Sequence, residues 1–95
     1  MQFRVATPRT IQPAIRVAIK LFAQYAELVG LPQVEIELPQ GATVADAVAA
    51  LRSQVPAAAQ LPEHPLAARN LTHVLPTQPL ADGDELALLP PLAGG

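Results

Sequence analysis

The sequence predicts an α+β domain in which one main helix lies across a mixed β-sheet. Three observations carry this prediction. Apolar and polar residues alternate near both ends of the chain, an apolar stripe with helical spacing runs through its middle, and proline- and glycine-rich stretches separate these segments. The 95 residues suit one domain, and an apolar share of 51% supplies a core without cysteine.

Residues 14–21 predict the first strand because apolar side chains occupy every second position, with Arg16, Ala18 and Lys20 between them. A short helix is predicted next, over 22–30, where Gly30 is placed to end it in a left-handed conformation. The apolar residues at helical spacing in this segment are Phe22, Tyr25, Leu28 and Val29. Residues 34–38 alternate again and predict a second strand with an acidic outer face, which a turn at 39–41 ends.

The main helix is predicted to begin after Thr43, which is a good N-cap, and Asp46 three residues later resembles a capping box. Pro56 ends this helix because proline lacks the backbone N–H that a helix interior requires. Its apolar stripe consists of Val44, Ala47, Val48, Leu51 and Val55.

The last third of the chain predicts loops and strands. Residues 56–65 contain three prolines and indicate a surface loop. Residues 66–75 hold either one strand or a tight pair with Asn70 in the turn, and 76–84 form a turn. Residues 85–89 predict a final strand in which Glu85, Ala87 and Leu89 share a face, so neither face is fully polar.

Composition excludes several classes of function. The net charge of −2, the lack of a basic stripe and the small number of aromatic residues argue against nucleic-acid binding. No apolar run approaches the roughly 20 residues that span a bilayer, so we expect a soluble, cytoplasmic protein without membrane contact. Residues 1–13 show no signal peptide and are interpreted as a flexible extension.

Conventional catalytic and metal-binding constellations are also missing. His64 and His73 stand alone and are interpreted as an exposed loop residue and a solvated strand residue. The acidic residues Asp82, Asp84 and Glu85 are interpreted as a solvated turn, since Ca²⁺ loops space their oxygens more regularly. We therefore expect no metal site and no free-standing enzyme.

The C-terminus is the most informative segment of the sequence. Pro90-Pro91 end strand pairing and form a stiff spacer, and Leu92-Ala93-Gly94-Gly95 follow. Because glycine has no side chain beyond hydrogen, a segment of two glycines can pass through a narrow channel and let another backbone approach closely. Residues 91–95, fully extended, project roughly 16 Å. From residue types alone, a frayed terminus and a working tail over 92–95 both remain open.

At this point the chain resembles the MoaD/ThiS family of ubiquitin-like sulfur carriers, and within it the molybdopterin synthase branch. The matching segments are IRVAIKLFAQYAELVG, PQGATVADAVAAL and PLADGDELALLPPLAGG, and with the order of elements they cover residues 14–95. The ending is the most specific part. The resemblance implies a β-grasp fold over residues 14–91, with the tail 92–95 beyond it.

The resemblance also implies a mechanism in which the protein is not itself an enzyme and binds no cofactor. An E1-like (MoeB-like) adenylyltransferase uses ATP to adenylate the Gly95 carboxylate, and a sulfur donor then displaces AMP to leave a thiocarboxylate. The tail enters the large, MoaE-like subunit of molybdopterin synthase. The sulfur there passes to the cyclic pyranopterin precursor during molybdenum cofactor biosynthesis.

Carried over by position, Gly95 bears the sulfur, while Gly94 and Ala93 thread the narrow channel. The residues expected at the partner interface are Leu89, Pro90, Pro91 and Leu92. Two alternatives remain open: a carrier for thiamin, for tRNA thiolation or for ligation to protein lysines, and a ubiquitin-like module that docks without using its terminus. Residues 1–13, the Pro/Ala-rich stretch 56–65 and Arg69 depart from the family pattern.

Overall fold

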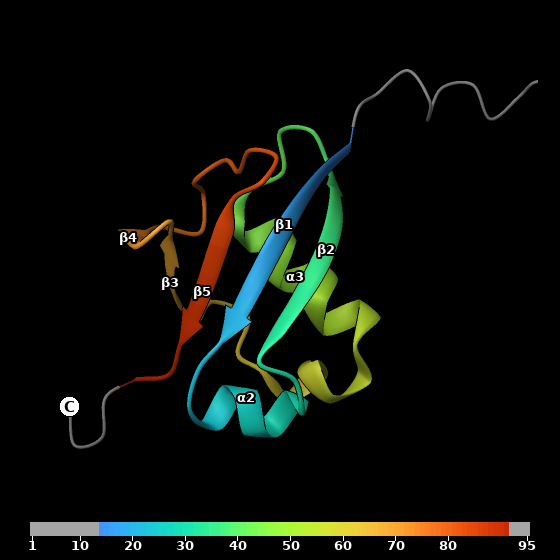
Figure 1. Ribbon diagram of the computed structural model, residues 1–95, viewed down its shortest axis with the longest axis vertical. Coiled ribbons are helices and arrows are strands. Elements are labelled where there is room, and N and C mark those ends of the chain that lie inside the picture. The colour runs from blue at the N-terminus through green and yellow to red at the C-terminus, as the bar shows by residue number, and fades with distance from the viewer. Residues whose placement is uncertain (1–13, 92–95) are drawn as a thin grey trace, which may run out of the picture.

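The computed structural model describes residues 14–91 (Figure 1). The predictions for residues 1–13 and 92–95 lie outside the described residues. The elements in chain order are β1 (Ala14–Leu21), α2 (Gln24–Val29), β2 (Gln33–Pro39), α3 (Val44–Gln54), the 3₁₀ helix η1 (Pro56–Gln60), β3 (Leu66–Arg69), β4 (Thr72–Val74) and β5 (Glu85–Leu89).

The strands form one five-stranded mixed sheet in the order β2-β1-β5-β3-β4. β1 runs antiparallel to β2 and parallel to β5, while β3 runs antiparallel to both β5 and β4. The last strand of the chain therefore lies in the middle of the sheet, beside the first. This arrangement confirms the predicted α+β β-grasp fold.

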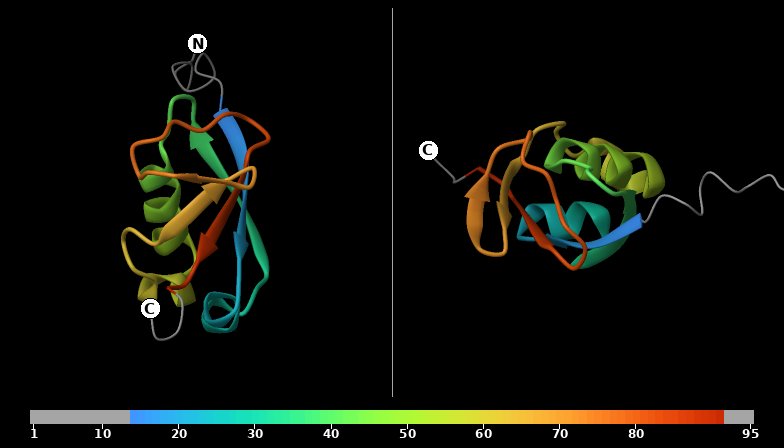
Figure 2. Two further views of the ribbon diagram at one scale, coloured as in Figure 1. Left: turned by 90° about the vertical axis from the view of Figure 1, so that its left-hand side faces the viewer. Right: turned by 90° about the horizontal axis from the view of Figure 1, so that it is seen from above.

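The helix α3 covers one face of the sheet and leaves the other face open (Figures 1 and 2). Alternate residues of β1, β2 and β5 point toward α3, as the sequence pattern predicted, and make up most of the core with the apolar stripe of the helix. Within this stripe Val55 is only half-buried, and the other members are buried. Val17, Ile19, Leu51, Leu86 and Leu88 are fully buried.

Helix α3 begins with the capping box that the sequence predicted. The Thr43 side chain accepts a hydrogen bond from the Asp46 amide at 3.3 Å, and an Asp46 carboxylate oxygen accepts one from the Thr43 amide at 2.9 Å. Two amides at the helix start are thereby satisfied. Within residues 14–91, the longest helix is too short and too polar to cross a membrane.

The first helix differs from the prediction at its beginning. Phe22 was expected on its apolar stripe, but α2 begins only at Gln24, and Phe22 stays outside the core with 45% of its surface exposed. Leu28, expected on the same stripe, is exposed as well. The reason is length: α2 has six residues, so only Tyr25 and Val29 reach the core. Gly30 ends the helix in the left-handed conformation, as predicted, with φ of 86°.

Residues 56–65 also differ from the predicted loop, because the 3₁₀ helix η1 occupies 56–60. Pro56 stands at its first position, where the fixed φ of proline favours a helical turn and the missing N–H is not needed. The small side chain of Ala58 is fully buried in this turn, and Leu61 fills the core just after it. Proline and alanine therefore build a packed turn here.

The alternatives for residues 66–75 are resolved in favour of two strands. β3 and β4 pair through a two-residue loop, Asn70-Leu71, and both loop residues have positive φ. This backbone pattern matches the right-handed twist of the flanking strands. Arg69 belongs to β3, and its guanidinium donates a hydrogen bond to the Pro79 carbonyl at 3.2 Å.

Candidate functional site: the sheet end where the tail begins

The tail begins at a defined place in the sheet. Because β5 runs parallel to β1, the C-terminal ends of both strands lie at the same end of the sheet, where Leu21 pairs with Leu88. Leu89 is the last residue of β5 and is half-buried, as is Pro90, while Pro91 is exposed. The expected tail residues Leu92, Ala93, Gly94 and Gly95 lie outside the described residues.

Four large apolar side chains form a row across the open face at this end of the sheet. Leu89 lies opposite Leu66 in the β5–β3 register. Phe22 and Leu75 extend the row on either side, since each comes one position beyond the last paired residue of β1 or β4. Phe22, Leu66 and Leu75 have 45%, 49% and 67% of their surfaces exposed. We call these four residues, Phe22, Leu66, Leu75 and Leu89, the tail-base patch.

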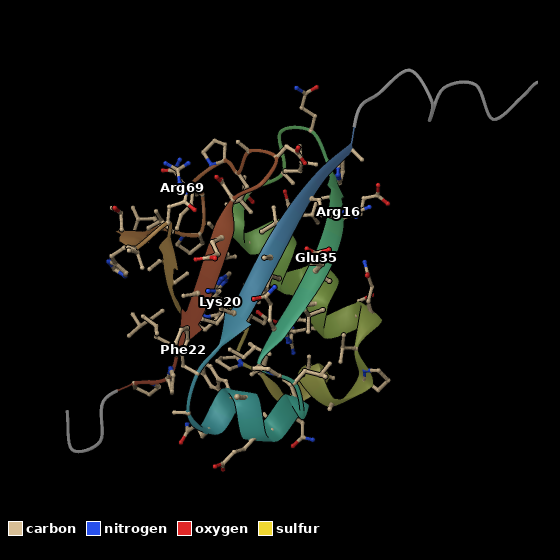
Figure 3. All side chains as sticks on the ribbon, viewed as in Figure 1. Arg16, Lys20, Phe22, Glu35 and Arg69 are labelled. Carbon is tan, nitrogen blue, oxygen red and sulfur yellow. The ribbon has the colours of Figure 1, made fainter. Side chains whose placement is uncertain are left out.

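The chain holds Phe22 outward by two backbone hydrogen bonds around it. The Leu21 amide donates to the Pro32 carbonyl at 2.9 Å, and the Tyr25 amide donates to the Phe22 carbonyl at 3.0 Å. The sharp bend between them places Ala23 at φ of 50°, a region that residues with a side chain rarely adopt. Figure 3 shows Phe22 at the end of β1, close to the end of β5.

Sequence reasoning missed Phe22, Leu66 and Leu75 as surface residues of a site. A signal existed for Phe22: with Ile19 and Leu21 directed inward, strand parity sends the next residue outward. The register of Leu66 and Leu75 depends on a hairpin that the sequence left open. Leu89 was assigned to the outer face by parity, and it lies on that face, while its role in partner binding stays a prediction.

Away from the tail, the open face becomes charged. Lys20 lies 3.1 Å from the Glu85 carboxylate, and Arg16 lies 4.0 Å from that of Glu35, with all four side chains at least one-third exposed. Figure 3 shows Arg16, Lys20 and Glu35 on the side of the sheet facing the viewer. Such exposed pairs contribute little to stability, about 0–1 kcal/mol each. The apolar row at the tail thus borders a zone of paired charges.

The opposite end of β5 is anchored by the acidic turn. Asp84 is buried, which corrects the prediction of a fully solvated turn; its carboxylate accepts hydrogen bonds from the Ala81 amide at 2.8 Å and the Asn70 side chain at 3.1 Å. An oxygen of Asp82 accepts from the Arg16 amide at 2.8 Å. These carboxylates therefore have a structural role, because backbone and amide donors occupy their oxygens.

A second uncharged surface lies on the other side of the tail's starting point. An open groove of about 480 Å³ there is lined by residues from α2, η1 and the segment after it, together with Pro91. Among residues 14–91, no three His, Asp or Glu side chains gather where they could hold a metal ion. His64 and His73 are both exposed. The tail-base patch and the lining of this groove thus consist of apolar and uncharged side chains.

A comparison with models of protein families identifies the family of this chain. The model of the ThiS family matches residues 19–95, which include β1 from Ile19, the tail-base patch and the Gly-Gly end. The chain belongs to the ThiS family. It is a ubiquitin-like sulfur carrier of the MoaD/ThiS type, and the carriers of this family are small proteins without catalytic activity of their own.

Relatives of this ThiS-family chain fall into two groups. Small archaeal modifier protein 1 of Haloferax volcanii is 38% identical over 80% of this chain and 97% of its own length. Its crystal structure covers 84% of this chain and 99% of its own with a TM-score of 0.74 at 36% identity. The molybdopterin synthase sulfur carrier subunit of Chlamydomonas reinhardtii is 32% identical over 85% of this chain and all of its own.

A further structure shares only the fold with this chain. It is a complex of subunits 1 and 2 of the molybdopterin-converting factor from Helicobacter pylori, and it covers 85% of this chain and all of the matched one at a TM-score of 0.60 and 21% identity.

Proposed function

We propose that the protein is the sulfur-carrier small subunit of a molybdopterin synthase, acting in the cytoplasm. Its Gly95 thiocarboxylate donates sulfur to the cyclic pyranopterin precursor of the molybdenum cofactor. The single observation that carries this proposal is the ending, in which an apolar strand, Pro90-Pro91 and a terminal Gly94-Gly95 follow in one run. The likeness to the Chlamydomonas reinhardtii subunit, 32% identical, supports it.

The chemistry of the proposal takes place at the last carbonyl carbon of the chain. A carboxylate is a poor electrophile, so an E1-like adenylyltransferase first joins Gly95 to AMP at the expense of ATP. A sulfur donor then attacks that carbon, AMP leaves, and the thiocarboxylate carries negative charge on a nucleophilic sulfur. A carrier of this kind requires no cysteine, and the sequence contains none.

In this proposal the tail-base patch gives the partners a surface at the end of β5, from which the chain continues into the tail. In the proposed complex the large synthase subunit covers Phe22, Leu66 and Leu89, and the spacer Pro90-Pro91 directs the tail into that subunit. Burial of apolar surface of this kind stabilises a complex by roughly 25 cal/mol per Å² before the entropic cost of association. General acid–base groups and oxyanion donors come from the partner.

The proposal also assigns a role to each of the other tail residues, Leu92, Ala93 and Gly94. Leu92 contacts the partner at the entrance of its channel. Ala93 and Gly94 pass through the channel because they add almost no side-chain width. No cofactor binds to the carrier itself, and ATP is consumed by the activating partner.

A second candidate function is a protein modifier whose terminus is joined to lysine side chains of other proteins. The observation that favours it is the 38% identity to small archaeal modifier protein 1 over nearly the whole of that relative. Activation of Gly95 is the same in both functions. They differ in what attacks the activated carbon, sulfur in the first and an amine in the second.

Mass spectrometry of the intact chain distinguishes these functions. The chain is expressed with its activating enzyme and a sulfur donor, and then mixed with the large synthase subunit and the precursor. Sulfur carriage predicts exchange of one oxygen for sulfur at Gly95 and its reversal when molybdopterin forms. A chain that stays unmodified, or that appears only in amide linkage to other proteins, would exclude the proposal. A chain truncated by one residue at Gly95 is the matched control.

A further inference from the structure

Strand β2 forms one edge of the sheet, and its register shows which of its backbone groups face outward. The Ala18 amide of β1 donates a hydrogen bond to the Asp84 carbonyl at 3.0 Å, so the backbone groups of Ala18 face β5. Opposite residues of an antiparallel pair either bond to each other or both point away. Glu35 lies opposite Ala18, so its N–H and C=O point away from β1, as do those of Glu37 two residues later.

These outward groups are available for pairing with another chain. Within residues 14–91, β1 is the only strand beside β2, and no other hydrogen bond reaches the backbone of Glu35 or Glu37. The pairing with β1 runs unbroken from Gln33 to Pro39, so the edge is straight over seven residues. A regular edge with free donors and acceptors is a template for an added strand.

The charges along this edge select what can pair with it. The Glu35 and Glu37 side chains are exposed on the open face, and Figure 3 shows Glu35 there beside Arg16. Arg16 lies 4.0 Å from Glu35, and no basic side chain of residues 14–91 lies that close to Glu37. Two β2 edges pairing antiparallel about Ile36 would place Glu35 of one copy opposite Glu37 of the other. Like charges in that position destabilise, so a second copy is disfavoured.

The other face of an added strand would meet an apolar layer. The alternate residues of β2 face α3, where Ile36 and Leu38 are buried and Val34 is half-buried. Helix α3 packs against β2, and Figure 1 shows its C-terminal end reaching past the edge of that strand. A strand added to β2 would thus lie over the helix on one face. Its opposite face would lie in solvent beside the carboxylates.

We infer that the edge of β2 is a docking site for an extended segment of another protein, in which lysine or arginine alternates with β-branched apolar residues. The segment adds a sixth strand. Its basic residues lie opposite Glu35 and Glu37 and exchange backbone hydrogen bonds with them, and its apolar residues face α3. The edge lies two strand spacings, about 10 Å, from β5, so this docking leaves the end of β5 uncovered and does not depend on the proposed sulfur chemistry.

Amide hydrogen exchange of the full chain, followed by NMR, tests the pairing residue by residue. The probe is a capped seven-residue peptide with lysine at every second position and valine between. Without peptide, we expect the Glu35 and Glu37 amides to exchange fast and the Ile36 amide, bonded to β1, to exchange slowly. Saturating peptide should slow Glu35 and Glu37 by at least about tenfold and leave Ile36 unchanged. Unchanged exchange at Glu35 and Glu37 would overturn the inference and leave the acidic edge a protection against aggregation.

Two methylated peptides separate strand pairing from attraction between charges. Residues opposite Glu35 and Glu37 turn their own N–H groups toward β2, so methylation of the lysine backbone nitrogens should abolish binding. Methylation of the valine nitrogens, which face solvent, should leave binding within about twofold of the unmodified peptide. Equal binding of the two methylated peptides would mean that charge alone holds them, and the proposed strand addition would be wrong.

Matched double variants of the protein test the carboxylates. Glu35→Lys with Glu37→Lys should weaken peptide binding by about tenfold or more, since two favourable pairs become repulsive. Glu27→Lys with Glu63→Lys has the same net charge at exposed positions outside the sheet and should bind several-fold better than the edge variant. Glu35→Gln with Glu37→Gln is a milder second variant if the lysines disturb folding. Equal loss in the edge and control variants would overturn the inference, as would protection of Glu35 that grows with protein concentration alone, which assigns the edge to a second copy.

Discussion

Asn70 and Asp84 join the β3–β4 hairpin to the start of β5. The Asn70 side chain donates a hydrogen bond to Asp84 Oδ1 at 3.1 Å, and its own Oδ1 accepts one from the Glu85 amide at 2.9 Å. The backbone N–H of Asn70 in turn donates a hydrogen bond to the backbone carbonyl of Glu85 at 2.9 Å. The start of β5 is thus held by side-chain hydrogen bonds in addition to its backbone pairing with β1 and β3.

Replacing Asp84 tests this anchor. Asp84→Ala leaves the Ala81 amide and the Asn70 side chain without their acceptor, so we expect the free energy of unfolding to fall by about 1–3 kcal/mol. Urea denaturation followed by circular dichroism measures the change. Glu37→Ala, at an exposed position of β2, is the control and should be neutral. An Asp84→Ala chain as stable as the wild type would show that the anchor is dispensable.

Phe22 tests the tail-base patch. Phe22→Asp places a charge in the apolar row, so we expect binding to the large synthase subunit to weaken by at least about tenfold, as loss of a central aromatic contact commonly does. The melting temperature should change little, because Phe22 is already 45% exposed. Isothermal titration calorimetry measures the affinity.

The matched control for Phe22 is Leu71→Asp. Leu71 is also an exposed apolar residue, but it lies in the hairpin loop beside Glu85, at the end of the sheet far from the tail. It should bind the large subunit like the wild type. Equal weakening by both variants would mean that the tail-base patch has no special part in docking.

Extending the chain tests the role of its last atom. One alanine added after Gly95 moves the carboxylate beyond the position expected in the partner, so sulfur transfer should be lost while the melting temperature is unchanged. Single-turnover conversion of the precursor measures the transfer. Full activity of the extended chain, with mass spectrometry showing that the alanine is still present, would contradict the proposal.

Leu71 tests the backbone of the hairpin loop. It has φ of 75° and 94% of its surface exposed, so it gains no burial in return for a strained conformation. Glycine adopts this conformation freely, and after its greater entropy loss on folding we expect Leu71→Gly to stabilise the protein by about 0.5–1 kcal/mol. Thermal denaturation followed by circular dichroism should show a melting temperature higher by a few degrees. A lower melting temperature would point to a contact of Leu71 that outweighs the strain.

Much of the fold was predictable because local periodicity carries it. The alternation in β1, β2 and β5, the capping box of Thr43 and Asp46, and the left-handed Gly30 each depend on residues close together in the chain. The terminal Gly94-Gly95 and the absence of cysteine are likewise properties of the sequence alone. These features indicated both the fold and the family.

The surface around the tail could not be predicted in this way, since it depends on which strands pair and in what register. Phe22, Leu66 and Leu89 come from three distant segments, and only the placement of β5 between β1 and β3 brings them into one row. The periodicity of the sequence predicts the face of the sheet on which each side chain lies. Its neighbours on the adjacent strands are determined by long-range packing and backbone hydrogen bonds.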